Sequence, residues 1–139
     1  MASVSKMARI NASADAVWEV VRDFGGVAKW IGPVTGCTMA GEGVGAVRTV
    51  TLEGGAEVQE RLEALDDGAR SLSYAIVSSP LPIENYLSTI QVSAASDDEC
   101  EVAWSSTFDV APADEAEMKT LVAGVYTAGF EGLKKLLGG

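Results

Sequence analysis

The chain has 139 residues, of which 47% are hydrophobic, and its 20 acidic against 10 basic side chains give a net charge of −10. We expect residues 1–139 to form a single domain that folds without a disulfide or a metal ion. So acidic a surface repels nucleic-acid phosphates and anionic lipid headgroups, and no run of about eighteen apolar residues is present to span a membrane. Neither nucleic-acid binding nor membrane insertion is expected.

Histidine, the commonest general base and metal ligand, does not occur in the sequence. Cys37 and Cys100 cannot bind a metal ion alone, and their spacing matches no disulfide or metal motif. The first ten residues lack the apolar block of a signal peptide. We therefore predict no metal, no cofactor and two reduced thiols in a cytoplasmic protein. Monomer and homodimer both remain open.

Three elements are predicted before the middle of the chain. Residues 3–10 alternate polar and apolar side chains, which indicates a strand. Ser13 stands where a helix N-cap belongs, and apolar side chains at helical spacing follow it as far as Gly25-Gly26. A second short helix, about Val27 to Trp30, is stopped by Gly32-Pro33.

Short β-rich runs separated by turn sequences fill the stretch from Val34 to Val110 and predict six consecutive strands. Connections this tight pair such strands as an antiparallel meander. Asp114 and Glu117 then resemble a capping box at the start of a helix to Leu137, which Gly138-Gly139 end. Its predicted apolar face contains Met118, Leu121, Val122, Val125, Leu133 and Leu136.

A lone helix of this length must bury its apolar face, and the concave side of the sheet is the partner large enough to cover it. The predicted fold is therefore α+β: a seven-stranded curved antiparallel sheet wraps around a long C-terminal helix, with two short helices after the first strand. A sheet that curls too widely for its own side chains to fill leaves a cavity. We predict one of several hundred Å³, as is usual for ligand sites.

Three segments, Gly45 to Arg48, Glu60 to Asp67 and Asn85-Tyr86, resemble the polyketide cyclase/dehydrase-like branch of the START superfamily, which includes the birch-pollen-allergen family and the plant abscisic-acid receptors. The resemblance covers essentially the whole chain. It implies a helix-grip fold with an internal pocket for an apolar small molecule, but not catalysis, because most members bind and only some react. The receptors' gating loop is shortened here to Glu53 to Ala56 and their latch is replaced by Leu81 to Ile83, which argues against a hormone-receptor role.

The alternation of residues 56–65 places Val58, Glu60, Leu62 and Ala64 toward the helix. A three-residue loop at 54–56 sets Val50 opposite Glu60 and Arg48 opposite Leu62, and a three-residue loop at 66–68 sets Tyr74 opposite Glu60. The Asn-Tyr resemblance implies that Tyr86 and Ser88 also point inward. In strand 101–110, apolarity favours Val102, Trp104, Phe108 and Val110 as the inward set, whereas the resemblance favours Ala103, Ser105 and Thr107.

A buried carboxylate needs a partner, so Glu60 admits three interpretations. It pairs with Arg48 to brace the sheet, orients a polar group of a ligand, or acts as a catalytic acid/base. Glycines 124, 129 and 132 in the helix indicate either space for a ligand or close helix–sheet packing. The predicted ligand-binding residues are Arg48, Val50, Leu52, Glu60, Leu62, Tyr74, Tyr86, Ser88, Leu121, Val125 and Gly129.

Three functions are compatible with this sequence. The first is binding of a small, largely apolar or aromatic metabolite, polyketide- or lipid-like, in the cavity. The second is a cofactor-independent polyketide cyclase or dehydratase in which Glu60 is the acid/base, Tyr74 or Tyr86 a proton donor and Arg48 an enolate stabiliser. The third is a scaffold or stress protein whose cavity is incidental. A polar cluster inside a cavity favours the first two.

Overall fold

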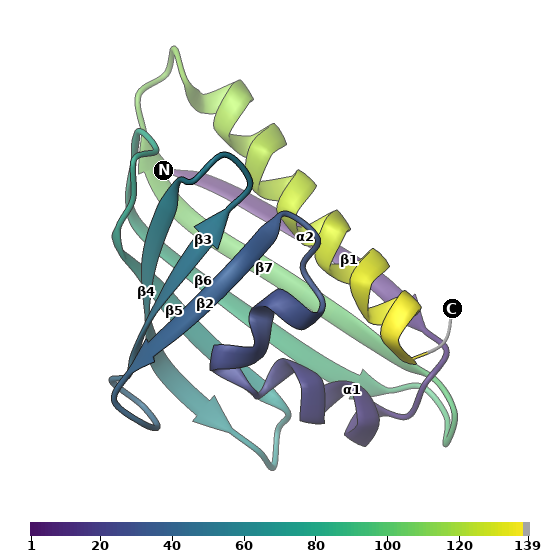
Figure 1. Ribbon diagram of the computed structural model, residues 1–139. Coiled ribbons are helices and arrows are strands. Elements are labelled where there is room, and N and C mark those ends of the chain that lie inside the picture. The colour runs from purple at the N-terminus through teal and green to yellow at the C-terminus, as the bar shows by residue number, and fades with distance from the viewer. Residues whose placement is uncertain (138–139) are drawn as a thin grey trace.

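The computed structural model describes residues 1–137, and in it seven antiparallel strands form one curved sheet around a long C-terminal helix (Figure 1). Along the sheet the order is β1-β7-β6-β5-β4-β3-β2, so the last six strands form the predicted meander and β1 pairs with β7. The elements are β1 (Ala2–Ile10), α1 (Ala14–Val21), the 3-10 helix η1 (Phe24–Lys29), β2 (Val34–Ala40), β3 (Val47–Leu52), β4 (Glu57–Asp66), β5 (Ser71–Ser78), β6 (Ile83–Ala94), β7 (Cys100–Val110) and α2 (Glu115–Leu137).

Both short elements after β1 are present, with corrected boundaries. The first helix was predicted to run as far as Gly25-Gly26 but ends at Val21. Ser13 caps α1, because its side-chain oxygen accepts a hydrogen bond from the Ala16 N–H at 3.1 Å. The second helix was predicted at 27–30 but is the 3-10 helix η1, which starts at Phe24 and includes Gly25-Gly26. Tight i→i+3 bonds hold it, for example from Gly26 N–H to the Asp23 carbonyl at 2.9 Å.

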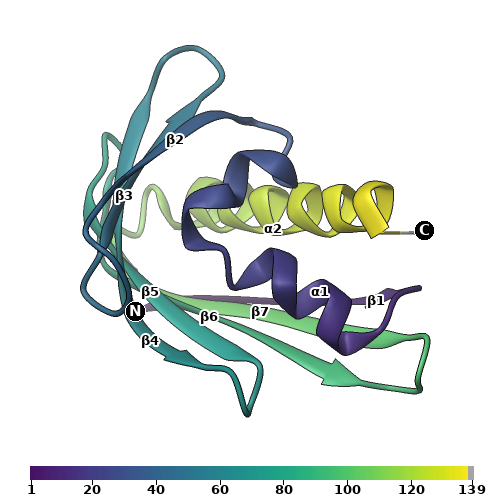
Figure 2. The same ribbon diagram turned by 60° about the horizontal axis from the view of Figure 1, so that its bottom comes forward.

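Helix α2 runs on the concave side of the sheet and contacts β1 and β7, while α1 contacts β6 and β7 (Figure 2). The prediction for the apolar face of α2 is partly wrong, because Leu121 and Leu136 are 39% and 49% exposed. They lie at the edges of a buried stripe that is rotated toward Tyr126, Gly129 and Phe130. Gly138-Gly139, the predicted end of the helix, lie outside the described residues.

Two glycines of α2 allow close packing of the helix. A Cβ on Gly129 would lie 2.7 Å from the Trp104 ring, and one on Gly132 would lie 1.5 Å from the Trp30 carbonyl oxygen. Gly124, in contrast, has nothing within 4 Å of its Cβ position. The close-packing interpretation therefore holds for Gly129 and Gly132.

The β3–β4 hairpin differs in register from the prediction. Arg48 pairs directly with Glu60, and Val50 pairs with Val58. Its loop is 53–55 rather than 54–56, because the Leu52 N–H donates to the Ala56 carbonyl oxygen at 2.8 Å and so closes the hairpin there. Gly54 and Gly55, both with φ of +92°, lie in this turn. Each partner moves by two residues, so every side chain keeps its predicted face.

In the β4–β5 hairpin, Tyr74 pairs with Leu62 rather than with Glu60. The connecting loop has four residues, 67–70, instead of three, and the register shifts again between Leu62 and Ala64. Such a bulge reverses the parity of the residues beyond it. Ala64, predicted to point inward, is therefore exposed, and Leu65 packs against the core instead.

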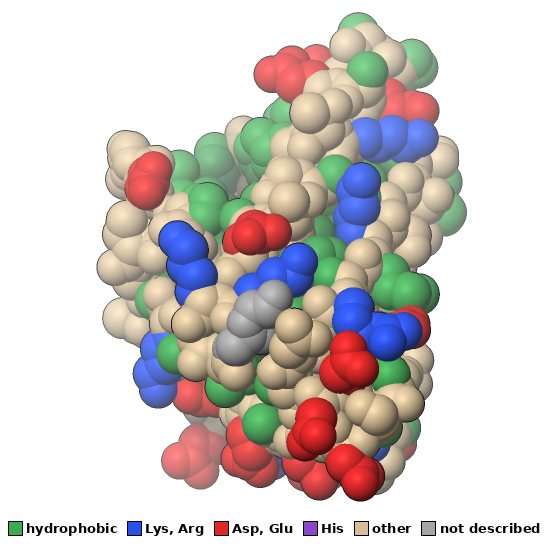
Figure 3. All heavy atoms as spheres, turned by 90° about the vertical axis from the view of Figure 1, so that its right-hand side faces the viewer, with side chains coloured by type: hydrophobic (Ala, Val, Ile, Leu, Met, Phe, Trp, Pro, Cys, Tyr) green, Lys and Arg blue, Asp and Glu red, His purple; other side chains and the backbone are tan. Residues whose placement is uncertain are grey.

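Strand β7 resolves the open alternative in favour of the apolar set. Val102, Trp104 and Phe108 are almost fully buried, and Val110 is half-buried. Both cysteines are free thiols. None of the helices described for residues 1–137 is long and apolar enough to cross a membrane. Acidic side chains gather at the lower end of the face shown in Figure 3, with lysines and arginines scattered above them.

Candidate functional site

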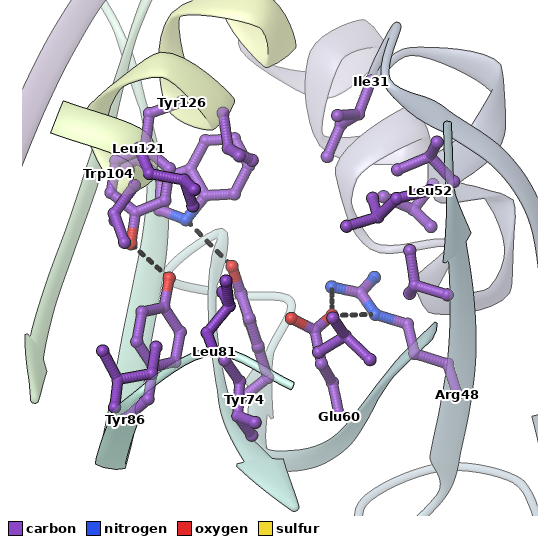
Figure 4. Close-up of a pocket in the computed structure, with 18 residues that line it drawn as sticks. Ile31, Arg48, Leu52, Glu60, Tyr74, Leu81, Tyr86, Trp104, Leu121 and Tyr126 are labelled. Carbon is purple, nitrogen blue, oxygen red and sulfur yellow. Dashed lines mark hydrogen bonds and ion pairs between the residues drawn. The ribbon is translucent and has the colours of Figure 1, made fainter. Parts of the chain in front are cut away.

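A cavity of about 100 Å³ lies between the concave face of the sheet and the N-terminal half of α2, beside η1 (Figure 4). It is smaller than predicted because aromatic rings project into it: Trp104 stacks on Tyr126 with ring centroids 4.2 Å apart, and Tyr74 lies 6.1 Å from Tyr86. Most of its lining is apolar. The lining residues are Val27, Ile31, Val34, Arg48, Val50, Leu52, Val58, Glu60, Tyr74, Ile76, Leu81, Ile83, Tyr86, Trp104, Leu121, Val122, Val125 and Tyr126.

Most of the predicted ligand-binding residues meet at this cavity. Those that line it are Arg48, Val50, Leu52, Glu60, Tyr74, Tyr86, Leu121 and Val125. The cavity does not reach Leu62, Ser88 or Gly129. Leu62 is buried in the core, Ser88 is buried and hydrogen-bonded, and Gly129 packs against two tryptophan rings.

Tyr126 is the main lining residue that the sequence reasoning missed. It lies four residues after Val122 and eight after Met118, and all three are buried on one face of α2. This spacing is the signal that could have found it, since residues four apart share a helix face. The predicted ligand-binding residues on this helix were Leu121 and Val125, which directly precede Val122 and Tyr126 in the sequence.

Arg48 and Glu60 form an ion pair in one wall of the cavity. Glu60 Oε1 lies 2.8 Å from Arg48 Nε and 2.7 Å from Arg48 Nη2, and the side chains are only 7% and 14% exposed. Arg48 Nη1 donates to the Phe24 carbonyl oxygen at 2.9 Å. The guanidinium also lies 3.9 Å from the Phe24 ring centroid and 5.0 Å from that of Tyr74.

A hydrogen-bond network forms the opposite wall, where Figure 4 shows Tyr86, Trp104 and Tyr126 together. Ser88 Oγ must donate to the Ser105 carbonyl oxygen at 3.1 Å, because a carbonyl can only accept. Ser88 has one proton, so Tyr126 donates to Ser88 at 3.1 Å and Tyr86 in turn donates to Tyr126 at 2.5 Å. The direction of this chain is thereby fixed.

Tyr74 lies between the two walls. Its hydroxyl oxygen accepts from the Trp104 indole N–H at 3.3 Å. Nearby Ser88 Oγ already accepts from Trp104 at 2.9 Å and from Tyr126 at 3.1 Å, so within residues 1–137 the Tyr74 proton has no acceptor of its own. Burial, reinforced by the nearby Glu60 charge, raises the pKa of Tyr74 far above its usual value. Burial likewise raises the pKa of Tyr86 and of Tyr126. All three hydroxyls are therefore protonated at neutral pH.

The two walls give the cavity complementary polar groups. Tyr74 offers a hydroxyl proton, and the second carboxylate oxygen of Glu60 accepts no hydrogen bond from the described part of the chain. Over those same residues, no group of three histidine, cysteine or carboxylate side chains is placed to hold a metal ion. The arrangement can orient a small apolar molecule by one or two hydrogen bonds, or exchange a proton with it.

Comparisons with known proteins show the family to which the chain is related. Residues 1–138 match the family described as "Polyketide cyclase / dehydrase and lipid transport". The chain is 37% identical over 89 residues to the abscisic acid receptor PYL2 of Arabidopsis thaliana. The aligned segment covers 60% of this chain and 47% of the receptor. It thus spans about half the length of that curated relative.

Solved structures confirm the predicted fold. The protein XoxI from Bacillus cereus superposes with a TM-score of 0.92 at 30% identity, over 99% of this chain and 96% of that one. Norcoclaurine synthase from Thalictrum flavum, solved with dopamine and hydroxybenzaldehyde, has a TM-score of 0.80 at 22% identity over 97% and 85% of the two chains. The latter similarity concerns the fold alone.

Proposed function

This chain belongs to the polyketide cyclase/dehydrase and lipid transport family, and we propose that it binds a small, largely apolar molecule of polyketide- or lipid-like character between α2 and the sheet. The observation that carries the proposal is an apolar cavity with polar groups confined to two places on its walls. Such cavities are typical of small-molecule sites, where few polar groups fix the orientation of the ligand.

The cavity volume limits what enters without rearrangement. An apolar cavity of about 150 Å³ accepts benzene, so about 100 Å³ holds a fragment no larger than one ring. Leu121 lines the cavity and is 39% exposed, so the cavity reaches solvent beside it. A longer ligand would extend through this mouth, with its ring inside.

A second candidate is a cofactor-independent cyclase or dehydratase with Glu60 as acid/base. The observation that favours it is the oxygen of Glu60 that Arg48 leaves free, together with the free Tyr74 proton. A carboxylate and a phenol on neighbouring strands could remove a proton from a substrate and return one to it. Binding is the common requirement of both candidates.

Native mass spectrometry of freshly purified protein, followed by thermal-shift screening of aromatic polyketides, sterols and fatty acids, tests the proposal. A ligand at about 100 times its Kd should stabilise the protein by ~2.7 kcal/mol. Leu121→Trp, which fills the mouth, should abolish that stabilisation. Leu136→Trp is the matched control, because Leu136 is an exposed leucine of the same helix outside this cavity.

Two results would contradict the proposal. One is that no compound binds, which would support a scaffold with an incidental cavity. The other is that Leu121→Trp binds the ligand as tightly as the unsubstituted protein, which would place the site elsewhere.

A further inference from the structure

We infer that the cavity selects a neutral aromatic ligand whose polar group is a hydroxyl, and that it rejects carboxylates; this inference rests on the proposed function and specifies its ligand. Among the described residues, Arg48 and Glu60 are the charged side chains that line the cavity. The choice between an acid and an alcohol therefore depends on which of these two presents a free group to the ligand.

Arg48 is held by partners within the protein. Nε and Nη2 converge on Glu60 Oε1 at 2.8 and 2.7 Å, and Nη1 donates to the Phe24 carbonyl oxygen at 2.9 Å. The rings of Phe24 and Tyr74 lie against the guanidinium. Its charge is compensated at contact distance, so Arg48 is a poor anchor for a second carboxylate.

Glu60 presents the free group. Both contacts from Arg48 go to Oε1, and the other carboxylate oxygen is drawn without a bond in Figure 4. The Glu60 side chain is 14% exposed, so its carboxylate is largely shielded from solvent. A buried carboxylate oxygen gains most from a donor, and hydrogen bonds to charged groups are among the stronger ones in proteins.

The opposite wall does not reverse this preference. The chain from Tyr86 through Tyr126 and Ser88 passes each proton on to a protein acceptor. Tyr74 keeps one free proton, which can be donated to the oxygen of a ligand hydroxyl while that hydroxyl donates to Glu60. A carboxylate could use the Tyr74 proton but would bring a second negative charge beside Glu60.

The aromatic walls favour a flat ring as the apolar part. Tyr74, Tyr86 and Trp104 all line the cavity, and Trp104 already stacks on Tyr126. Rings pack against one another in offset or edge-on arrangements. Phenol is the simplest molecule that combines such a ring with a hydroxyl, and a single ring is the upper limit that the cavity volume sets.

Four single-ring probes test the inference by isothermal titration at pH 7: phenol, anisole, toluene and benzoate. Phenol should bind about tenfold or more tighter than anisole, since anisole keeps the oxygen but cannot donate to Glu60. Benzoate should bind more weakly than toluene, although it has a polar group that toluene lacks, because its carboxylate places a second negative charge beside Glu60. These comparisons use the unsubstituted protein, so they do not depend on the folding of a variant.

Glu60→Gln supplies the second measurement. It removes the negative charge that compensates Arg48 and repels an anion, so benzoate should bind at least tenfold tighter than before, while the preference for phenol over anisole shrinks. Glu63→Gln is the matched control, since Glu63 is on the same strand and pairs with Arg61 at the surface. It should leave all four affinities unchanged.

The outcomes separate this inference from the proposed function. Equal binding of phenol, anisole and toluene would overturn the hydroxyl preference and leave the apolar site standing. Tighter binding of benzoate than phenol would overturn it too, and would make Arg48 an anion anchor. Failure of every probe, including toluene, would count against the cavity as a binding site and so against the proposed function itself.

Discussion

Arg48 and Glu60 face each other directly across β3 and β4, and their ion pair is the most buried among those of residues 1–137. Its two side chains are 7% and 14% exposed, whereas the Arg61–Glu63 pair on the outer side of β4 is 46% and 34% exposed. Arginine and glutamate thus form one ion pair on the inner face of the sheet and another on its outer face. This contrast allows the value of burial to be measured within one protein.

Arg48→Met should lower the free energy of unfolding by about 3–5 kcal/mol, because it leaves the Glu60 carboxylate buried without its partner. Arg61→Met should change it by less than about 1 kcal/mol, as is usual for exposed pairs. Urea unfolding at neutral pH measures both. The double variant Arg48→Met/Glu60→Gln should recover part of the loss, and equal effects of the two single variants would show that burial is irrelevant here.

The glycines of α2 give opposite expectations for the same substitution. Gly132→Ala should destabilise the protein strongly, since its Cβ would lie 1.5 Å from the Trp30 carbonyl oxygen. Gly124→Ala should stabilise it by up to about 1 kcal/mol, because nothing lies within 4 Å and alanine favours the helix. Thermal unfolding of both variants is the measurement, and a tolerated Gly132→Ala would contradict the observed packing of α2 against Trp30.

Local signals were sufficient to predict the order of elements and the meander, because each strand is bounded by its own turn chemistry. They were insufficient for register. A three-residue loop fits equally well at 53–55 or 54–56, since both contain Gly54 and Gly55, and only the backbone hydrogen bond from Leu52 to Ala56 distinguishes the two. The bulge after Leu62 has no such local signal, since it depends on how β4 bends against β5.

The composition of the site was therefore easier to predict than its geometry. Side-chain alternation found Arg48, Glu60 and Tyr74 despite two register errors, because both errors preserved parity at these positions. The cavity volume could not be predicted, since it depends on how far the rings of Trp104 and Tyr126 enter the space.

Asp67 should stabilise the fold in a pH-dependent way. Hydrogen bonds from Arg22, and then from the Trp18 indole, lower the pKa of its carboxyl. A lowered pKa in the folded state contributes stability above the unfolded value of about 4, and this stability is lost as the pH falls through the folded value. Asp67→Asn should thus be less stable than the unsubstituted protein at pH 7, with the difference disappearing in acid. Asp97→Asn, at an exposed position, is the control for urea unfolding across this range.

The tyrosines should make the protein sensitive to alkali. The sequence has three, Tyr74, Tyr86 and Tyr126, and burial raises the pKa of each. Above pH about 10 the unfolded chain loses protons that the folded chain keeps, so stability falls as the pH rises, by up to about 1.4 kcal/mol per pH unit for each tyrosine. Tyr86→Phe should reduce that slope. Tyrosinate absorbance should appear only on unfolding, and titration of a tyrosine near pH 10 in the folded protein would refute this.

Glu60→Gln distinguishes an enzyme from a binding protein once a ligand is known. Glutamine keeps the shape of the side chain and an acceptor oxygen but cannot exchange a proton with a substrate. If Glu60 is the general acid/base, turnover of the bound compound should fall by roughly 100-fold or more while a neutral ligand still binds. Glu63→Gln, on the outer side of the same strand, should leave turnover intact. Turnover is followed by chromatography of the bound compound under single-turnover conditions, and affinity by titration of the same samples.

Unchanged turnover in Glu60→Gln would remove Glu60 from any catalytic role. Conversely, a bound compound that is recovered intact from the unsubstituted protein would identify Glu60 as a group that orients a ligand, and the protein as a carrier.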